Sequence, residues 1–141
     1  MRGVGEQPLD RLLIATGATL ARFRQRVVAA HGLSATALDL LAALSGEDGL
    51  PHRELAGRLG LTPATLTPVV DALERSGDVR RERDANDRRV VRVYLTDGGR
   101  LRRATVADQV DRALRDTLPG DEPTVRRYLG EVLAAVEGRL T

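Results

Sequence analysis

The sequence predicts a mainly α-helical protein with one small β-hairpin, and three observations support this fold class. Apolar residues recur at helical spacing along most of the 141 residues. Two consecutive short helices, each with its own start and stop signals, lie near the middle of the chain. Directly after them, the apolar spacing changes to the alternation of a half-buried strand pair. We therefore expect the element order α-α-α-α-β-β-α-α within a single domain.

The N-terminal part of the chain predicts two helices. Residues 8–30 carry leucine, phenylalanine and valine at helical spacing, which indicates a long amphipathic helix. His31 and Gly32 end this helix. Ser34 can cap a second helix, whose leucines share one face and which ends near Gly46.

The next two helices form a helix-turn-helix pattern. Pro51 suits the first position of a short helix that ends at Gly60. Thr62 offers the hydroxyl of an N-cap residue, Pro63 has the preset backbone angle of a first helical position, and Gly77 suits the position after the helix end. A short turn through Gly60 joins the two helices.

Two strands and two helices follow. Residues 79–83 and 90–95 predict a β-hairpin, because apolar and polar side chains alternate along the second of them. Thr96 can cap a helix that runs to about Thr117. The segment LPGDEP breaks it, and a last helix follows.

The side chains at the tip of the predicted hairpin are too polar to be buried in a core. The segment RERDANDRR, residues 81–89, holds four arginines and three acids, and its only apolar side chain is alanine. Residues 51–103 carry twelve arginines against eight acids, a net charge of +4, whereas the whole chain carries +2. Positive charge concentrated in this way is typical of a nucleic-acid-binding surface.

A helix-turn-helix followed at once by a hairpin is a winged helix. Its second helix fits the major groove of DNA, while the wing lies over the backbone and the minor groove. Arginine is drawn to the negative potential of a narrow minor groove, so an arginine-rich wing tip predicts DNA binding.

Two acids can orient the wing arginines. Asp87 is adjacent to Arg88 and Arg89 and can hold a guanidinium by ion pairing, and Asp71 on the preceding helix is another candidate. The outward face near the start of that helix has small side chains that suit close contact with bases or phosphates. The predicted DNA-contacting residues are Arg53, Thr62, Ala64, Thr65, Thr67, Pro68, Arg81, Arg88 and Arg89.

Other arginines allow more than one interpretation. Arg80 and Arg83 can point inward from the strands and pair with acids. Arg100, Arg102 and Arg103 lie in the first turns of the helix after the hairpin, where positive charge opposes the helix dipole. They either contact phosphate or pair with a second copy of the chain.

The chain resembles the MarR family of bacterial transcriptional regulators over nearly its whole length. The matching residues are LTPATLTPVVDALERSGDVRRERDANDRRVVRVYLTDGGR. They include a D-x-R-type wing signature at 87–89 and the closing L-T-x-x-G at 95–99.

The resemblance implies a homodimer that binds a pseudo-palindromic operator and usually represses transcription until a small ligand or an oxidant releases it. It divides the single domain, residues 1–141, into dimerisation helices at 1–33 and 97–141 and a winged helix-turn-helix at 34–96. Repression and activation both remain open, and so does the identity of the effector.

The resemblance also implies roles for particular residues. The recognition helix lies near 62–76 and the wing near 79–95. In the family, the position of Asp71 is often paired with a wing arginine, and Arg88 and Arg89 are those expected to enter the minor groove.

Three departures from the family pattern matter. The stretch TLTP at 65–68 is similar to the branch that senses organic hydroperoxides through a cysteine, but this chain has no cysteine, so that mechanism is excluded. Pro68 stands where many relatives have a basic residue, and a proline inside a helix favours a kink. Asp78 replaces the apolar residue that usually follows the helix-ending glycine, and we expect it to loosen the turn into the wing.

Other functions find little support. His31 and His52 have no metal-ligand pattern around them, and no P-loop, GxGxxG or GxSxG motif occurs, so we expect no metal, no cofactor and no enzymatic activity. No apolar run is long enough to cross a membrane and no signal peptide is evident, which indicates a cytoplasmic protein. Because aromatic residues are scarce, any effector pocket would be mainly aliphatic, and no residues are assigned to it.

The alternative from another class is a winged helix that meets an acidic protein partner instead of DNA. The net charge of residues 51–103 and the polar outward face of the predicted recognition helix argue against it. A hydrophobic outward face would have favoured it.

Overall fold

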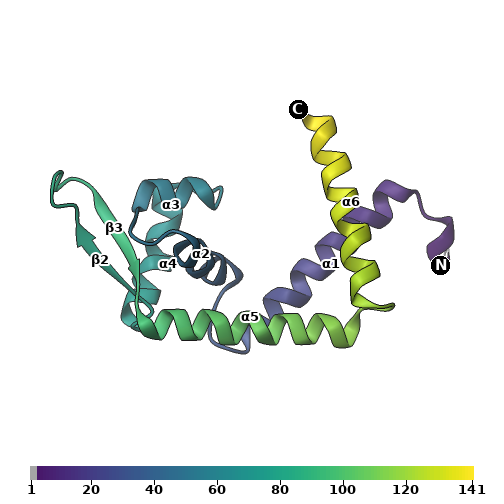
Figure 1. Ribbon diagram of the computed structural model, residues 1–141, viewed down its shortest axis with the longest axis horizontal. Coiled ribbons are helices and arrows are strands. Elements are labelled where there is room, and N and C mark those ends of the chain that lie inside the picture. The colour runs from purple at the N-terminus through teal and green to yellow at the C-terminus, as the bar shows by residue number, and fades with distance from the viewer. Residues whose placement is uncertain (1–2) are drawn as a thin grey trace. The chain divides into compact units, whose positions relative to one another are not determined.

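The computed structural model describes residues 3–141 and confirms a mainly α-helical fold with a small antiparallel sheet (Figure 1). Residues 1 and 2, part of the expected 1–33 segment, lie outside the described residues. Internal contacts divide the chain into a first unit that ends at Val110 and a second unit, Asp111–Thr141. The elements are η1 (Val4–Glu6), α1 (Leu9–Ala29), α2 (Ala35–Gly46), β1 (Leu50–Pro51), α3 (His52–Arg58), α4 (Pro63–Arg75), β2 (Val79–Arg83), β3 (Val91–Leu95), α5 (Asp97–Thr117) and α6 (Glu122–Leu140).

The predicted helix starts are confirmed by their hydrogen bonds. The Ser34 hydroxyl accepts from the N–H of Ala37 at 3.0 Å, and the Thr62 hydroxyl accepts from the N–H of Thr65 at 3.1 Å. The Thr96 hydroxyl accepts from the third residue of α5 at 3.0 Å. These caps depend on local sequence alone, which is why the sequence predicts them.

The sheet has a third strand that the sequence did not reveal. Its order is β1-β3-β2, and β1 pairs Leu50 with Val93 and Pro51 with Arg92. The prediction that Pro51 opens α3 is therefore wrong, because Pro51 has an extended backbone and α3 begins at His52. A strand of two residues shows no periodicity, so only the tertiary structure could define it.

The core of the first unit holds α4 against the rest of the winged helix. Leu66, Val70 and Leu73 of α4 are buried, so the opposite face of this helix points outward. The largest fully buried side chains come from α1 to α5 and from the two long strands of the wing: Leu40, Leu41, Leu44, Leu55, Leu66, Val28, Val70, Val79, Val93 and Val106.

Asp78 ties the turn into the wing instead of loosening it, which corrects the prediction. Its carboxylate is buried and accepts from the Ser76 hydroxyl at 2.5 Å and from Arg102 of α5 at 2.6 Å. Gly99 of α5 packs directly on this turn, since a Cβ there would lie 2.0 Å from the Asp78 carbonyl oxygen. The apolar residue expected here is thus replaced by an ion pair.

Two of the arginines at the start of α5 pair within the chain. Arg102 also donates to the His31 carbonyl at 2.9 Å, and Arg100 forms an ion pair with Asp48 at 3.0 Å. The positive charges of Arg100 and Arg102 thus have partners within the chain, without a phosphate group or a second copy of the chain.

The second unit contains the end of α5 and all of α6. Asp121 caps α6 by accepting from the N–H of Thr124 at 3.0 Å, and Gly120 in the predicted break has a φ of +86°. Leu129, Leu133 and other apolar side chains of α6 are exposed. No helix among residues 3–141 is long and apolar enough to cross a membrane.

Candidate nucleic-acid interface

The outward face of α4 carries exposed side chains along one helical row. Ala64, Pro68, Asp71 and Arg75 follow the spacing i, i+4, i+7 and i+11, and all four are exposed. Arg75 was not among the predicted site residues, and its side chain forms no hydrogen bond or ion pair with any described residue. Its position in this row is the signal that could have identified it.

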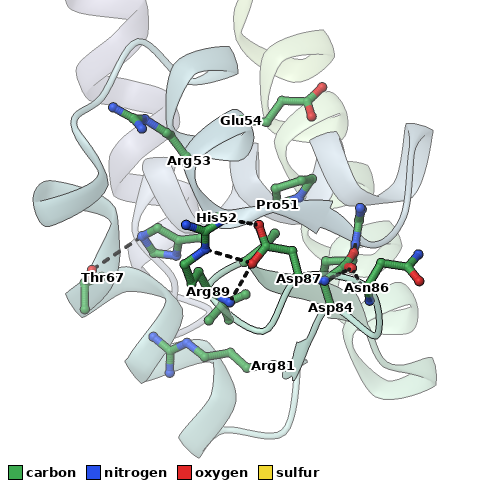
Figure 2. Close-up of a pocket in the computed structure, with 13 residues that line it drawn as sticks. Pro51, His52, Arg53, Glu54, Thr67, Arg81, Asp84, Asn86, Asp87 and Arg89 are labelled. Atoms are coloured by element: carbon green, nitrogen blue, oxygen red, sulfur yellow. Dashed lines mark hydrogen bonds and ion pairs between the residues drawn. The ribbon is translucent and has the colours of Figure 1, made fainter.

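The threonine hydroxyls of α4 are engaged within the helix-turn-helix. The Thr65 and Thr62 hydroxyls lie 2.8 Å apart, and the Thr67 hydroxyl donates to the Pro63 carbonyl at 2.9 Å. His52 Nε2 lies 3.0 Å from the same carbonyl, which can only accept, so His52 donates and joins α3 to the first turn of α4. Figure 2 shows His52 facing Thr67, whose hydroxyl lies 3.4 Å from the same ring nitrogen. The hydroxyl hydrogen of Thr67 is therefore used within the motif, while one hydroxyl of the Thr62–Thr65 pair keeps its hydrogen for another acceptor.

Asp84 organises the wing tip, and the sequence interpretation missed it. One carboxylate oxygen accepts from the N–H groups of Asn86 and Asp87 at 2.8 and 3.0 Å, and the other accepts from Arg92 Nε at 2.6 Å. The Asp84 side chain is only 13% exposed. The hydrogen bond from Arg92 and those from the backbone hold the pKa of Asp84 below its ordinary value. Asp84 therefore remains an anion that closes the turn.

Arg92 joins the wing to the chain beside β1. Besides pairing with Asp84, its guanidinium donates to the Gly49 carbonyl at 2.9 Å. Asp48 next to it accepts from the N–H of Leu95 at 2.8 Å. The wing is thus anchored at its tip by Asp84 and near its base by residues that precede α3.

Arg88 and Arg89 extend from this tip. Arg89 pairs with Asp87 through Nε at 3.1 Å and Nη2 at 3.2 Å, yet its side chain is 91% exposed. This pairing and the N–H of Arg89 lower the pKa of Asp87. The Arg88 side chain is exposed and has no partner among residues 3–141, although its carbonyl accepts from Arg83 at 2.9 Å.

Arg81 has a different environment from the arginines of the tip. Its guanidinium pairs with Asp71 at 2.6 Å and with Glu74 at 3.1 Å, and its side chain is 25% exposed. Asp71 thus contacts a wing arginine, but this arginine is Arg81 rather than Arg88 or Arg89. The pair fixes α4 against β2.

A second strand arginine is also engaged. Arg80 pairs with Glu82, and its guanidinium carbon lies 4.5 Å from the centre of the Tyr94 ring. This cation–π contact keeps Arg80 on the strand surface.

Side chains from α3, α4 and the wing converge on one open groove of about 1060 Å³. Figure 2 shows Arg89 and Asp87 joined in its middle, with Arg53 on α3 nearby. Among residues 3–141, no three His, Cys, Asp or Glu side chains are grouped so as to hold a metal ion. The groove is lined by Pro51, His52, Arg53, Glu54, Thr67, Arg81, Asp84, Asn86, Asp87, Arg89, Val90, Val91 and Arg92.

Comparison with known sequences gives consistent matches. The family model described as "MarR family" matches residues 33–91. The HTH-type transcriptional regulator TtmR of Methylorubrum extorquens is 41% identical over 86 residues, which are 61% of this chain and 44% of TtmR. The uncharacterized HTH-type transcriptional regulator YdgJ of Bacillus subtilis is 30% identical over 112 residues, 79% of this chain and 68% of YdgJ. The match thus spans less than half the length of TtmR.

Solved structures extend the similarity to nearly the whole fold. CouR from Rhodococcus jostii RHA1, bound to p-coumaroyl-CoA, has a TM-score of 0.74 and 25% identity, covering 96% of this chain and 95% of CouR. The transcriptional repressor CouR, bound to a 23-mer DNA duplex, has a TM-score of 0.78 and 26% identity, covering 97% of this chain and 99% of that one.

Proposed function

Because the chain belongs to the MarR family, we propose that it is a DNA-binding transcriptional regulator, and more specifically a homodimeric repressor of a pseudo-palindromic operator that a small-molecule effector releases. The observation that carries this proposal is the wing tip. Two exposed arginines, Arg88 and Arg89, project from a turn that Asp84 holds closed. A preorganised cationic tip without apolar bulk suits a polyanionic groove.

The two parts of the interface would have separate roles. α4 would enter the major groove with its outward row facing the bases, while Arg88 and Arg89 would enter the minor groove. Arg53 and Arg75, both exposed, would contact phosphates. Arg81 would act indirectly, because its pairs with Asp71 and Glu74 set the position of the wing relative to α4.

Exposed apolar side chains support a homodimer. α1 exposes Leu9, Leu13 and Ile14, and α6 exposes Leu129 and Leu133, among others. Exposed apolar side chains gathered in this way favour burial against another surface. We assign dimerisation to residues 1–33 and 97–141 and DNA binding to residues 34–96. Two recognition helices would then meet half-sites about 34–36 Å apart, one helical turn of DNA.

Repression and effector release rest on the similarity to CouR, which is described as a repressor and was solved with p-coumaroyl-CoA. By analogy, a small organic molecule would weaken DNA binding by this chain. No residues are assigned to the effector site.

The test is binding of the purified protein to the DNA upstream of its own gene. Fluorescence anisotropy at several salt concentrations, with random DNA as competitor, measures both affinity and salt dependence. The wild-type protein is expected to resist the competitor and to bind as one dimer per site. Arg88→Ala with Arg89→Ala should weaken binding and reduce the slope of log K against log salt by about 0.9 for each phosphate that is no longer neutralised.

The matched control removes the same charge elsewhere. Arg22 and Arg26 are exposed on α1, within the segment assigned to dimerisation. Replacing both with alanine should leave the salt slope unchanged, provided that gel filtration shows the same oligomer as for the wild type. An equal loss of slope in both double variants would mean that net charge, not the wing, determines affinity. Failure to bind any DNA at low salt would favour the alternative, a winged helix that binds an acidic protein.

A further inference from the structure

We propose that the backbone carbonyl of Ala64 is a base-reading acceptor on α4, made available by Pro68. This inference rests on the proposed DNA-binding function and adds a specificity determinant to it. The recognised chemistry is an exocyclic amino group in the major groove, which belongs to adenine or cytosine.

The covalent structure of proline leaves this carbonyl without its helix partner. In an α-helix, the carbonyl of residue 64 accepts from the N–H of residue 68. Pro68 has no N–H, and α4 continues through it as a helix from Pro63 to Arg75. No side chain among residues 3–141 donates to the Ala64 carbonyl instead. The carbonyl therefore needs a donor from outside the helix.

The Ala64 carbonyl lies at the N-terminal end of the outward face of α4. Ala64 and Pro68 begin the exposed row that Asp71 and Arg75 continue. A helix carbonyl points along the axis toward the residue four positions later, so the Ala64 carbonyl lies on this same face. The proline ring crowds the position of the missing hydrogen, so we expect this carbonyl to tilt away from the helix axis toward solvent.

The carbonyl of Pro63, unlike that of Ala64, already accepts two hydrogen bonds. The Pro63 carbonyl receives both the His52 ring and the Thr67 hydroxyl, at 3.0 and 2.9 Å. Those two donors are consequently not available to Ala64 or to DNA. The N-terminal half of the outward face is thus poor in donors and offers acceptors and small apolar groups.

A helix face that offers mainly hydrogen-bond acceptors favours bases that donate a hydrogen bond in the major groove. Adenine N6 and cytosine N4 each donate in the major groove, whereas guanine O6 and thymine O4 only accept there. An unpaired carbonyl facing O6 or O4 would remain unsatisfied and repel the base oxygen. The Ala64 carbonyl should therefore select adenine or cytosine at one position in each half-site.

Nucleobase analogues test this selection. The wild-type protein first selects a binding site from a random duplex library. Each adenine of that site is then replaced by 2-aminopurine and each cytosine by 2-pyrimidinone, which lack the amino group in the major groove. At one position of each half-site, the wild-type affinity should fall by about 2- to 12-fold, as expected for the loss of one hydrogen bond.

Variants at position 68 show whether the Ala64 carbonyl is responsible. Pro68→Ala and Pro68→Val both restore the N–H that occupies this carbonyl, and valine keeps apolar bulk similar to that of the proline ring. Both should bind the analogue and the natural base at that position equally. Pro63→Ala is the matched control, because a proline at the first helical position frees no helix carbonyl. This variant should keep the wild-type sensitivity.

The outcomes separate the two proposals. A wild-type protein that selects a site but loses no affinity with any analogue overturns the inference and leaves the DNA-binding function intact. The same is true if the Pro68 variants remain as sensitive as the wild type. A protein that selects no sequence overturns both.

Discussion

Arg102→Ala tests how strongly α5 holds the turn into the wing. The Arg102 guanidinium donates to the Asp78 carboxylate at 2.6 Å and to the His31 carbonyl at 2.9 Å. The substitution removes both hydrogen bonds. It leaves the carboxylate of Asp78, whose side chain is only 5% exposed, with the Ser76 hydroxyl as its remaining side-chain donor.

The expected loss of stability follows from this burial. Removing one partner of a buried ion pair costs about 3–5 kcal/mol, because an uncompensated charge remains. The Arg102 side chain is 29% exposed, so water already screens part of the pair. We therefore expect a decrease of about 3 kcal/mol in the free energy of unfolding. For a domain of this size, that corresponds to a melting temperature about 10 °C lower.

Thermal unfolding followed by far-ultraviolet circular dichroism measures this change. Arg100→Ala is the matched control, because Arg100 lies on the same helix and pairs with Asp48 while both side chains are more exposed, at 47% and 35%. Its loss should cost no more than about 1 kcal/mol. Replacing Asp78 and Arg102 together should destabilise the protein less than Arg102→Ala alone, since no buried charge is left unpaired.

Two results would refute this reasoning. One is a melting temperature of Arg102→Ala that equals that of the Arg100→Ala control. The other is a double variant that is no more stable than Arg102→Ala. Either would mean that the Asp78 carboxylate does not depend on α5 for its stability.

Three further predictions concern the wing and its base. Gly99→Ala should lower the free energy of unfolding by about 1–3 kcal/mol in a denaturant titration, because its Cβ would overlap the Asp78 carbonyl. Asp84→Ala should weaken DNA binding in the anisotropy assay more than Asp84→Asn does, because asparagine still accepts hydrogen bonds from the N–H groups of the turn. Equal effects of the two substitutions would mean that the ion pair with Arg92 alone holds the wing tip in place. The pKa values of Asp84 and Asp87 are depressed in the folded state, so their stabilisation is complete above their unfolded pKa and is lost as the pH falls through the folded pKa. Hydrogen exchange of the tip should therefore be protected at pH 5 and above and lose that protection below about pH 4, and protection lost already at pH 6 would contradict the assignment.

Local signals were sufficient for much of the fold. The caps at Ser34 and Thr62 and the stop at Gly77 involve residues within a few positions of one another, so the residue types alone predict them. The alternation along the second strand predicted the hairpin in the same way. The arginines of its tip were recognisable because nothing in that segment could be buried.

The partners of the charged residues were beyond prediction from local sequence. The prediction that Asp71 pairs with a wing arginine is confirmed, but only the tertiary structure shows that this arginine is Arg81. Nothing in the sequence distinguishes Asp84 from the other acids of the hairpin. Only the folded turn brings its carboxylate against two N–H groups and Arg92.

What the sequence by itself determined is the order of helices and strands, the helix-turn-helix and the exposed cationic tip, because each follows from periodicity, caps or the absence of apolar side chains within a short segment. The tertiary structure alone decided the third strand and the ion pair of Asp78 with Arg102. Both join residues far apart in the chain, and an ion pair or a strand pairing has no periodic signal in either segment. Physical proximity between such segments exists only once the core has packed.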